Sequence, residues 1–532
     1  MSININNNRI NYFILTLFFL LLIYSINTNL SFFESGLKHW STYNKDDIVF
    51  VYNSLLYLEG LEQHHTDHPS LFTFIIFPIF YKIAFYLGYI DFYNLTSFLE
   101  SENINLSLSK LFYISRFVIQ IFSLGIVILV YKIANNFSLK KIDSLFISLL
   151  FILSTGFTSA SNRIESGLIS IFFVLLAFHF FLNFINLENK KNIIYFVLSL
   201  LFIFSAMMQK KLTFFVIPFI FFSCVTFFKK NEVIYIKYKF LNFRYLYIYL
   251  LTALYILVLT FIYFKTIDNN TLEISRDLDF IFLSFNYLFF NLICFFYIKR
   301  YQNKNYENLL TFNLLLCSTY FSYKFFLIYV FSAHSEIWTI SFTNFLGHLN
   351  MFVGSEEVKG AFDFSSLNLY FTKFINNFNL VLNKYFLSYN YQSILVWSNV
   401  LLFINFFNKT TFKKKLSFLF LFFGFLIIQS IILFRYEQDT YYLNSELLLL
   451  FSLSALIGNF KNTKNYFSFL VILFMILFYS NIDHLINLKK GNLKSYCHLF
   501  KNSDRSVEGF YEFYTNKIPL SKIRNFCIDL HI

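Results

Sequence analysis

Residues 111–132 read LFYISRFVIQIFSLGIVILVYK, and this stretch decides the class of protein. It is apolar along its length apart from Arg116, a few small polar residues and the terminal Lys132. An α-helix rises about 1.5 Å per residue, so the stretch covers about 33 Å, close to the hydrocarbon thickness of a bilayer. It therefore predicts a transmembrane helix that carries one arginine near one end.

The composition of the whole chain points the same way. The 532 residues are 57% hydrophobic and only 14% charged, with a mean hydropathy of +0.57. Soluble domains carry about a quarter charged residues, and none of this size would bury 81 Phe and 38 Tyr side chains. The net charge is +13, but no segment combines a basic face with exposed aromatic residues, so we expect no nucleic-acid partner. An integral membrane protein that contacts the lipid bilayer is predicted.

Apolar runs of roughly 17–25 residues, long enough to cross a bilayer, recur along the chain. We expect an all-α polytopic membrane protein with about 13 transmembrane helices. A first module would cover residues 1–230 and contain a long outer loop at 28–110. A second module would cover 231–481 and contain an outer loop at 333–390, and a short non-cytoplasmic tail would cover 482–532. The predicted spans lie at 11–27, 111–132, 143–160, 166–184, 192–209, 212–228, 245–265, 279–298, 308–332, 391–408, 415–434, 440–458 and 464–481.

The distribution of Lys and Arg orients these spans, because short cytoplasmic loops are enriched in both. With a cytoplasmic N-terminus and segment 71–90 outside the bilayer core, every short loop on the cytoplasmic side is basic. If 71–90 crossed the membrane, the strongest clusters would face outward. Pro78 and Lys82 also suit an interfacial helix there better than a spanning one. The basic loops lie at 132–141, 190–191, 229–244, 299–304, 409–415 and 461–464.

The C-terminal tail fits this orientation less well. It is rich in Lys and Arg, yet it falls on the outer side, although the bias weakens in longer terminal segments. Cys497 and Cys527 lie in it, and whether they pair depends on the compartment that the tail faces.

The richest predicted outer segment runs from Lys45 to Ser70. Its adjacent carboxylates, Asp46 and Asp47, perturb each other's proton affinity, which suits a general base beside a helper carboxylate. The structural alternative places both in the first turn of the amphipathic run 48–60, where they would stabilise a helix N-terminus.

A histidine-rich group follows in the same segment. His64, His65, Asp67 and His68 have side chains that suit zinc or another divalent ion. Their spacing matches none of the usual metal signatures, so a divalent metal stays open and no other cofactor is indicated.

Further charged residues fall on the predicted outer face, at the ends of separate spans. Interfacial Arg and Lys often only extend toward lipid headgroups. Gathered beside the acidic loop, however, the basic residues suit stabilisation of a leaving phosphate, and the carboxylate suits an attacking hydroxyl. These residues are Arg116, Arg163, Glu165, Lys210, Lys211 and Arg435.

The order of residues in the first outer loop matches a known pattern. Asp46-Asp47, Tyr52, Gly60 and His68-Pro69-Ser70-Leu71 follow one another before segment 71–90. This order resembles the GT-C superfamily of polyprenyl-phosphate-sugar-dependent glycosyltransferases, and most closely the branch of the lipid A aminoarabinose transferase and the protein O-mannosyltransferase relatives. In that branch an Asp-Glu pair, a Tyr, a Gly and a His-Pro or Lys-Pro-Pro precede an interfacial helix. Asp47 stands here where Glu is usual, and Ser70 where a second Pro is usual.

Later motifs of the family have counterparts as well. The family has an Arg at the start of the second span, an acidic residue after the third, a Lys-bearing turn in the middle and a late Arg-Tyr. The likeness covers about the first 230 residues, and the remainder only in span count and topology. The matching motifs are Ile114-Ser115-Arg116-Phe117, Asn162-Arg163-Ile164-Glu165, Gln209-Lys210-Lys211 and Arg435-Tyr436.

The resemblance implies a GT-C fold and inverting transfer of a sugar from a polyprenyl-phosphate donor to a glycan, lipid or protein acceptor. Asp46 would activate the acceptor, supported by Asp47, while Glu165, Arg163 and His68 would position the sugar or the acceptor. The site would lie on the non-cytoplasmic side of the inner (plasma) membrane. The residues implied to bind the donor phosphate are Arg116, Lys210, Lys211 and Arg435.

Two other functions stay open from the sequence. A polysaccharide polymerase or ligase would favour Arg-rich outer loops, whereas the loop 333–390 contains Lys but no Arg. A lipid or sugar transporter would favour helices interrupted by Gly or Pro and ionisable groups near the midplane. The chain has only 13 Gly and 4 Pro, and its charges fall at predicted helix ends, so transport is less favoured.

Overall fold

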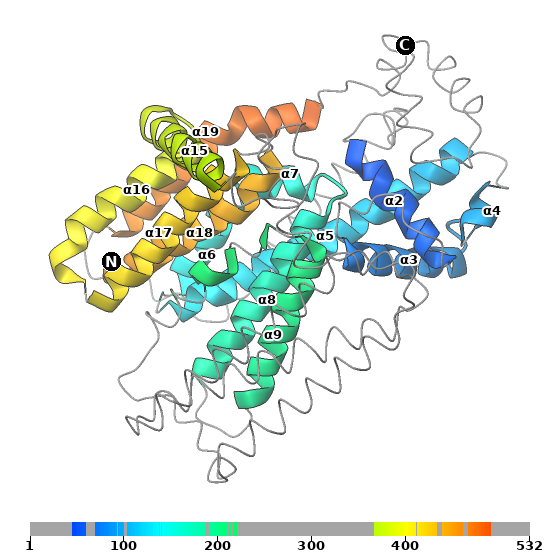
Figure 1. The fold of residues 1–532 in the computed structure, drawn as a ribbon, viewed down its shortest axis with the longest axis horizontal. Helices are drawn as coiled ribbons and strands as arrows, with labels where there is room; N and C mark the ends of the chain where they lie inside the picture. The colour runs from blue at the N-terminus through cyan, green and yellow to red at the C-terminus, as the bar shows by residue number, and fades with distance from the viewer. Residues whose placement is uncertain are drawn as a thin grey trace, which may run out of the picture.

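The structure is a computed structural model that describes residues 45–59, 70–99, 104–186, 192–223, 367–433, 439–460 and 466–490, with short gaps inside some of these ranges. Every regular element in the described ranges is helical (Figure 1). The predicted spans 11–27, 245–265, 279–298 and 308–332 lie outside the described residues. The α-helices are α2 (Lys45–Leu58), α3 (Leu71–Tyr86), α4 (Leu95–Leu99), α5 (Ile104–Asn136), α6 (Lys141–Ile152), α7 (Thr155–Ser161), α8 (Ser166–Asn186), α9 (Asn192–Gln209), α15 (Leu367–Leu387), α16 (Tyr391–Phe406), α17 (Phe412–Ile432), α18 (Tyr442–Phe460) and α19 (Tyr466–Lys490), with the 3-10 helices η5 (Phe407–Lys409) and η6 (Asp439–Tyr441).

Three described helices are long and apolar enough to cross a membrane: Lys110–Asn136 in α5, Ser166–Phe184 in α8 and Lys414–Ile432 in α17. They confirm the spans predicted at 111–132, 166–184 and 415–434. Shorter apolar helices occupy three further predicted spans. Within the described residues an all-helical fold with helices long and apolar enough to cross a membrane is therefore confirmed, while the number thirteen and the GT-C fold stay predictions. The shorter helices are Ile194–Met207, Tyr442–Ile457 and Ser468–Asn481.

At the predicted span 143–160 two helices are together long and apolar enough to cross a membrane, but they do not form one straight helix. The chain forms α6 and then α7, which are bent by 65° at a short break. Ser154 lies at the break with an extended backbone, and its side chain accepts a hydrogen bond from Phe157 N at 3.3 Å. Serine favours this N-cap conformation, so a new helix begins where hydropathy alone predicts continuation.

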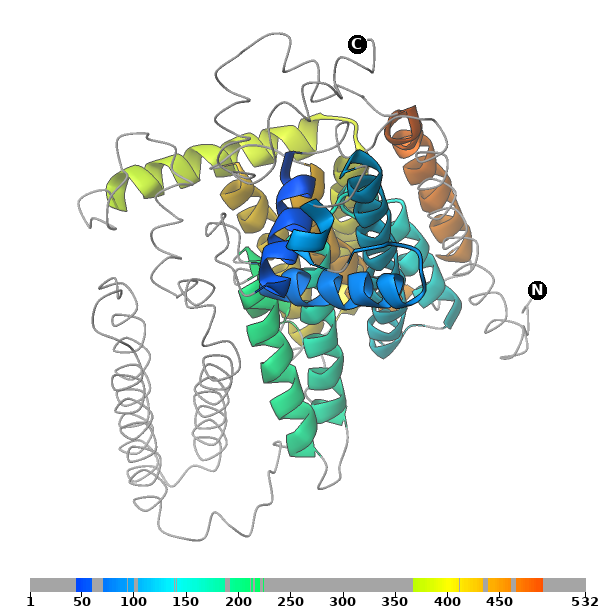
Figure 2. The ribbon, with the colours of Figure 1, turned by 90° about the vertical axis from the view of Figure 1, so that its right-hand side faces the viewer.

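Two helices run crosswise to the neighbouring apolar helices α8 and α9 (Figure 2). The first is α3, which at 16 residues is short for a span and matches the helix predicted at 71–90. Gly88, with φ 72°, turns the chain just after it. The second is α15, which places a 21-residue helix inside the predicted outer loop 333–390. Both orientations suit helices at the membrane interface.

α8 and α9 lie side by side and are joined by aromatic stacking (Figure 1). The ring of Phe202 stacks on Phe173 at 5.9 Å and on Phe180 at 5.6 Å. The Ser170 hydroxyl donates to Ala206 O at 2.9 Å. Because the two helices are antiparallel neighbours, the first residues of α8 lie beside the last residues of α9.

The path of α5 predicts which exposed positions lie on opposite sides of the membrane. Tyr89, just after α3, packs on Tyr113 near the start of α5, with ring centroids 6.2 Å apart. Leu87 is 79% exposed, and Asn135 is exposed at the far end of α5, about 30 Å along the helix axis from Tyr113. In a variant without native cysteines, Leu87→Cys should react with an impermeant maleimide in intact cells, and Asn135→Cys only after permeabilisation. Equal labelling of both in intact cells would show that α5 does not cross.

Candidate functional site

The site begins at Asp47, in the first turn of α2, where the sequence predicts a helix start. Its side chain is fully buried, at 0% exposure. Asp47 Oδ1 accepts a hydrogen bond from Ile164 N at 3.2 Å, and Asp47 Oδ2 lies 3.8 Å from Arg116 Nη2. Arg116 is itself only 5% exposed. One carboxylate thus joins α2, α5 and the turn between α7 and α8.

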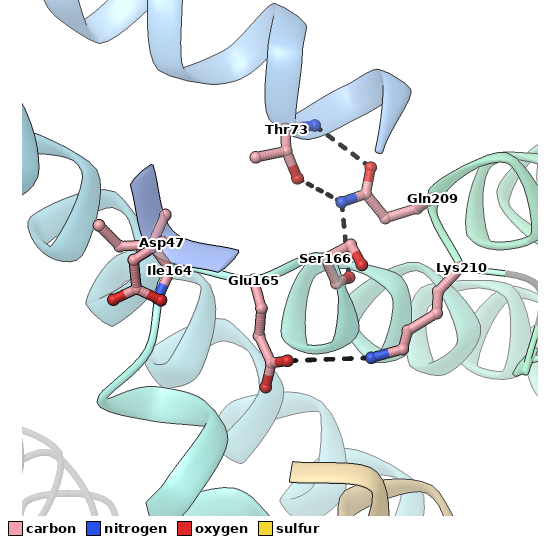
Figure 3. A network of polar contacts seen from close by, with 7 residues as sticks. All are labelled: Asp47, Thr73, Ile164, Glu165, Ser166, Gln209 and Lys210. Carbon is pink, nitrogen blue, oxygen red and sulfur yellow. Dashed lines mark hydrogen bonds and ion pairs between the residues drawn. The ribbon is translucent and has the colours of Figure 1, made fainter. Parts of the chain in front are cut away.

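A second ion pair lies on the other side of the same turn. Glu165 Oε2 is 4.0 Å from Lys210 Nζ, which follows the last residue of α9 (Figure 3). The Lys210 ammonium also lies 4.6 Å from the ring centre of Tyr441, in η6. The antiparallel packing of α8 and α9 explains the Glu165–Lys210 contact. Tyr441 packs against Lys210 from the C-terminal half of the chain.

Both ion pairs are longer than charge-assisted hydrogen bonds, which measure about 2.7–2.9 Å. Arginine carries five N–H donors and lysine three, so each cation can hold its carboxylate and still bind a second anion. The site therefore combines two carboxylates with two cations, each of which keeps N–H donors for a further partner.

Three buried polar atoms near these pairs have no hydrogen-bond partner among the described residues: Glu165 Oε1, Ser70 Oγ and Thr440 Oγ1. Ser70 immediately precedes α3, and Thr440 is next to Tyr441. Buried polar atoms are nearly always hydrogen-bonded, to protein, water or ligand. Two hydroxyls and a carboxylate oxygen would suit a ligand that offers hydroxyl or amine hydrogens.

Gln209 holds the N-terminus of α3 against this turn (Figure 3). Its Oε1 accepts hydrogen bonds from Phe72 N at 3.0 Å and Thr73 N at 3.2 Å, the groups that an N-cap side chain normally serves. Its Nε2 donates to Thr73 Oγ1 and to Ser166 O. Ser70, at the N-cap position itself, makes no side-chain cap, because Gln209 takes that role.

α3 also fixes the segment that carries Arg116. The Tyr81 hydroxyl and Ser115 Oγ are 2.6 Å apart. Burial raises the pKa of Tyr81, and the hydrogen bond to Ser115 opposes this only in part, so the phenol stays neutral at physiological pH. One turn further along α5, Gln120 Nε2 donates to Ser161 O at 2.7 Å and so ties α5 to the end of α7.

The structure thus brings together four of the predicted site residues: Asp47, Arg116, Glu165 and Lys210. Arg163 lies half-buried in the same turn. Asp46 lies in the first turn of α2, with a side chain outside the described part of the structure. The other predicted residues lie outside the described ranges, namely Lys211, Arg435, His64, His65, Asp67 and His68.

The structure gives no further metal candidate. Among the residues that it describes, no group of three or more His, Cys, Asp or Glu side chains is placed to hold an ion. The predicted metal ligands at 64–68 lie outside the described residues, so a divalent metal stays a prediction.

Sequence reasoning missed Gln209 and Tyr441 as parts of the site. Gln209 appears in the motif around Lys210 but carries no charge, and Tyr441 is one of 38 tyrosines. Nothing in their sequence context indicates the contacts they make, because these depend on the approach of α3 and η6 to the end of α9.

Comparison with known proteins leaves the family untested. No protein-family model matches the chain, and no curated protein or solved structure shows significant similarity to it. The GT-C resemblance therefore stays an expectation from the motifs.

Removal of the Gln209 side chain should loosen α3. In Gln209→Ala the backbone N–H groups of Phe72 and Thr73 lose their acceptor, at a cost of about 1–2 kcal/mol in the free energy of unfolding. Gln209→Glu keeps an acceptor oxygen for these N–H groups and loses only the Nε2 contacts with Thr73 and Ser166, so it should lose less stability than Gln209→Ala. Thermal unfolding in detergent would compare the two, and equal loss in both would contradict the capping role.

The Asp47–Arg116 pair should show energetic coupling. Asp47→Asn and Arg116→Met each leave a buried charge without its counterion. The double variant should therefore be destabilised by less than the sum of the two single losses. A coupling energy of about 0.5–3 kcal/mol is expected from unfolding of both single variants and the double variant. Strict additivity would show that the 3.8 Å contact contributes nothing.

Proposed function

We propose that the chain is an inverting glycosyltransferase that moves a sugar from a polyprenyl-phosphate donor to a cell-envelope glycolipid, polysaccharide or protein. The observation that carries the proposal is the convergence of two carboxylates and two cations, from four separate segments, beside membrane-spanning helices. A lipid-linked phosphate sugar needs this combination: cations for the phosphate, carboxylates for the sugar and acceptor, and a bilayer next to them.

The phosphate would bind between Arg116 and Lys210. As the bond to the sugar breaks, negative charge grows on the departing phosphate oxygen, and nearby cations in a buried site stabilise it. Both cations are largely buried, so water screens them little. Lys211 and Arg435, from the same predicted face, are further candidates for this role.

The acceptor would be activated by Asp46, with Asp47 as its support. Asp47 is fully buried and held by Arg116 and Ile164 N, so it suits a positioning role better than direct contact with an acceptor. Asp46 is its neighbour in the same helical turn. As general base it would take the proton of an acceptor hydroxyl or amine.

Transfer would then proceed in one displacement. The acceptor oxygen or nitrogen forms a bond to the anomeric carbon while the bond from that carbon to the phosphate oxygen breaks. The electron pair of the broken bond stays on the polyprenyl phosphate, and the acceptor proton goes to Asp46. Attack opposite the leaving group inverts the configuration, and no covalent sugar–enzyme intermediate forms.

The sugar would contact the buried polar atoms that have no hydrogen-bond partner among the described residues. Glu165 Oε1 accepts hydrogen bonds, and the hydroxyls of Ser70 and Thr440 can donate or accept. Arg163 and His68 are further candidates for positioning the sugar or acceptor. The crosswise helix α3 would lie at the outer membrane interface, where a lipid headgroup enters.

Transport is the second candidate, because two structural features favour it. The broken helix α6–α7 and the buried Glu446 of α18 resemble the interrupted helices and intramembrane charges of transporters. Transfer is favoured over transport because the ion pairs gather beside α3, at one end of the spanning helices, rather than along a path through the bundle.

The proposal can be tested with glycolipids extracted from cells with and without the gene, compared by mass spectrometry. Loss of one sugar from an envelope glycan, with accumulation of its polyprenyl-phosphate donor, is expected. In proteoliposomes Asp46→Asn should slow transfer about 10²–10⁴-fold, and Lys210→Met about 10²–10³-fold.

Lys132→Met is the matched control, because Lys132 is exposed at the other end of α5 and should not affect the rate. Donor movement across the bilayer without sugar transfer would favour the transporter. Rates near wild type in Asp46→Asn would exclude the proposed base.

A further inference from the structure

Glu446 is a buried carboxylate that the proposed mechanism does not use. It lies in the apolar helix α18 with 0% exposure. Its Oε2 accepts a hydrogen bond from Gly156 N at 2.8 Å, and its Oε1 accepts one from Gln392 Nε2 at 2.5 Å. A fully buried ionisable residue in an apolar helix is costly, so its contacts call for an explanation.

The contact lies at the break between α6 and α7. A break frees backbone groups that lipid cannot satisfy, so neighbouring side chains must do so. The carbonyl of Leu150 accepts from the Tyr391 hydroxyl, and that of Leu153 accepts from Asn481 Nδ2. Glu446 completes the set on the α7 side, so helices from the C-terminal half of the chain hold the break.

Gly156 brings α7 against the first turn of α18. A Cβ atom at this position would lie 2.1 Å from Leu443 N, so only glycine permits this approach. The close contact therefore restricts the position of the first turn of α7 against α18. The carboxylate of Glu446 holds the Gly156 N–H in that position.

The opposite end of α7 leads directly into the candidate site. The helix has seven residues, about 10 Å in length, and ends at Ser161. The next residues are the ones whose contacts define the site: Ile164 N donates to Asp47, and Glu165 pairs with Lys210. A shift at the start of α7 would therefore move both contacts.

We infer that Glu446 is a positioning residue that places α7, and through α7 the turn 162–165, against Asp47 and Lys210. The inference of a catalytic consequence rests on the proposed function, whereas the inference about α7 does not. The role depends on a side chain that is long enough to accept the hydrogen bond from Gly156 N. Glutamine at position 446 can still accept this bond with its Oε1, and its Nε2 can donate to Gln392 if the Gln392 amide rotates. Alanine can make neither contact.

Two readouts test this inference in the full-length protein. The first is the labelling rate of Asn162→Cys, at the far end of α7, in a variant without native cysteines. Glu446→Ala should change this rate several-fold, and Glu446→Gln should leave it near that of the parent. Ser445→Ala is the matched control, because Ser445 is equally buried in α18 but bonds Gln429 of α17 instead.

The second readout is steady-state transfer of the sugar. Glu446→Ala should lower kcat about ten- to hundredfold, because small misplacements of reacting groups have such effects, with KM changed less than about threefold. Glu446→Gln should restore kcat. If Glu446→Ala fails to fold, Glu446→Asp takes its place, and the shorter carboxylate should perturb labelling and kcat more than Glu446→Gln does.

The outcomes separate the two proposals. No transfer by the wild type, with the expected labelling pattern, would reject the proposed function and keep the positioning role. Equal labelling in Glu446→Ala and Ser445→Ala would reject the positioning role. Glu446→Asp resembling wild type while Glu446→Gln fails would show that charge, rather than reach, matters, and would also overturn the inference.

Discussion

The contacts of the Asp47 carboxylate set the arrangement of the N-terminal half. A fully buried carboxylate is costly unless hydrogen bonds and an opposite charge compensate it. Arg116 supplies the charge and the Ile164 N–H supplies a hydrogen bond. These partners come from α5 and from the turn after α7. Burial of the Asp47 carboxylate in α2 therefore depends on the positions of both elements. The same requirement brings Glu165, next to Ile164, toward Lys210.

The membrane imposes a second constraint, which is the satisfaction of backbone groups. α3 begins inside the protein, where water cannot serve its first N–H groups, and Gln209 does so from α9. The break between α6 and α7 poses the same problem, and side chains from α16, α18 and α19 solve it. In both places an uncharged or buried polar side chain from a distant segment completes a local backbone structure.

The sequence predicted what depends on composition along a single segment. Hydropathy located the helices in α5, α8 and α17 that are long and apolar enough to cross a membrane. The distribution of Lys and Arg predicts that 71–90 lies outside the set of spanning helices, and the structure forms the helix α3 there. The same charge test put Arg116, Glu165 and Lys210 on one face, and their contacts agree with this. The break near Ser154 escaped prediction because an interrupted helix is as apolar as a continuous one. Gln209, Tyr441 and Glu446 escaped because their roles arise only from contacts between distant helices.

The two halves of the chain contribute unequally to the site. The N-terminal half supplies every charged residue in the described ion pairs, whereas the C-terminal half supplies Tyr441 beside Lys210 and Glu446 at the start of α7. Within each ion pair the formal charges cancel. A phosphate would add negative charge next to two carboxylates, and it can be held only if the cations keep their positions against that repulsion. Rigid placement of α7 and η6 by the C-terminal helices would therefore be as necessary for binding as the charged residues themselves.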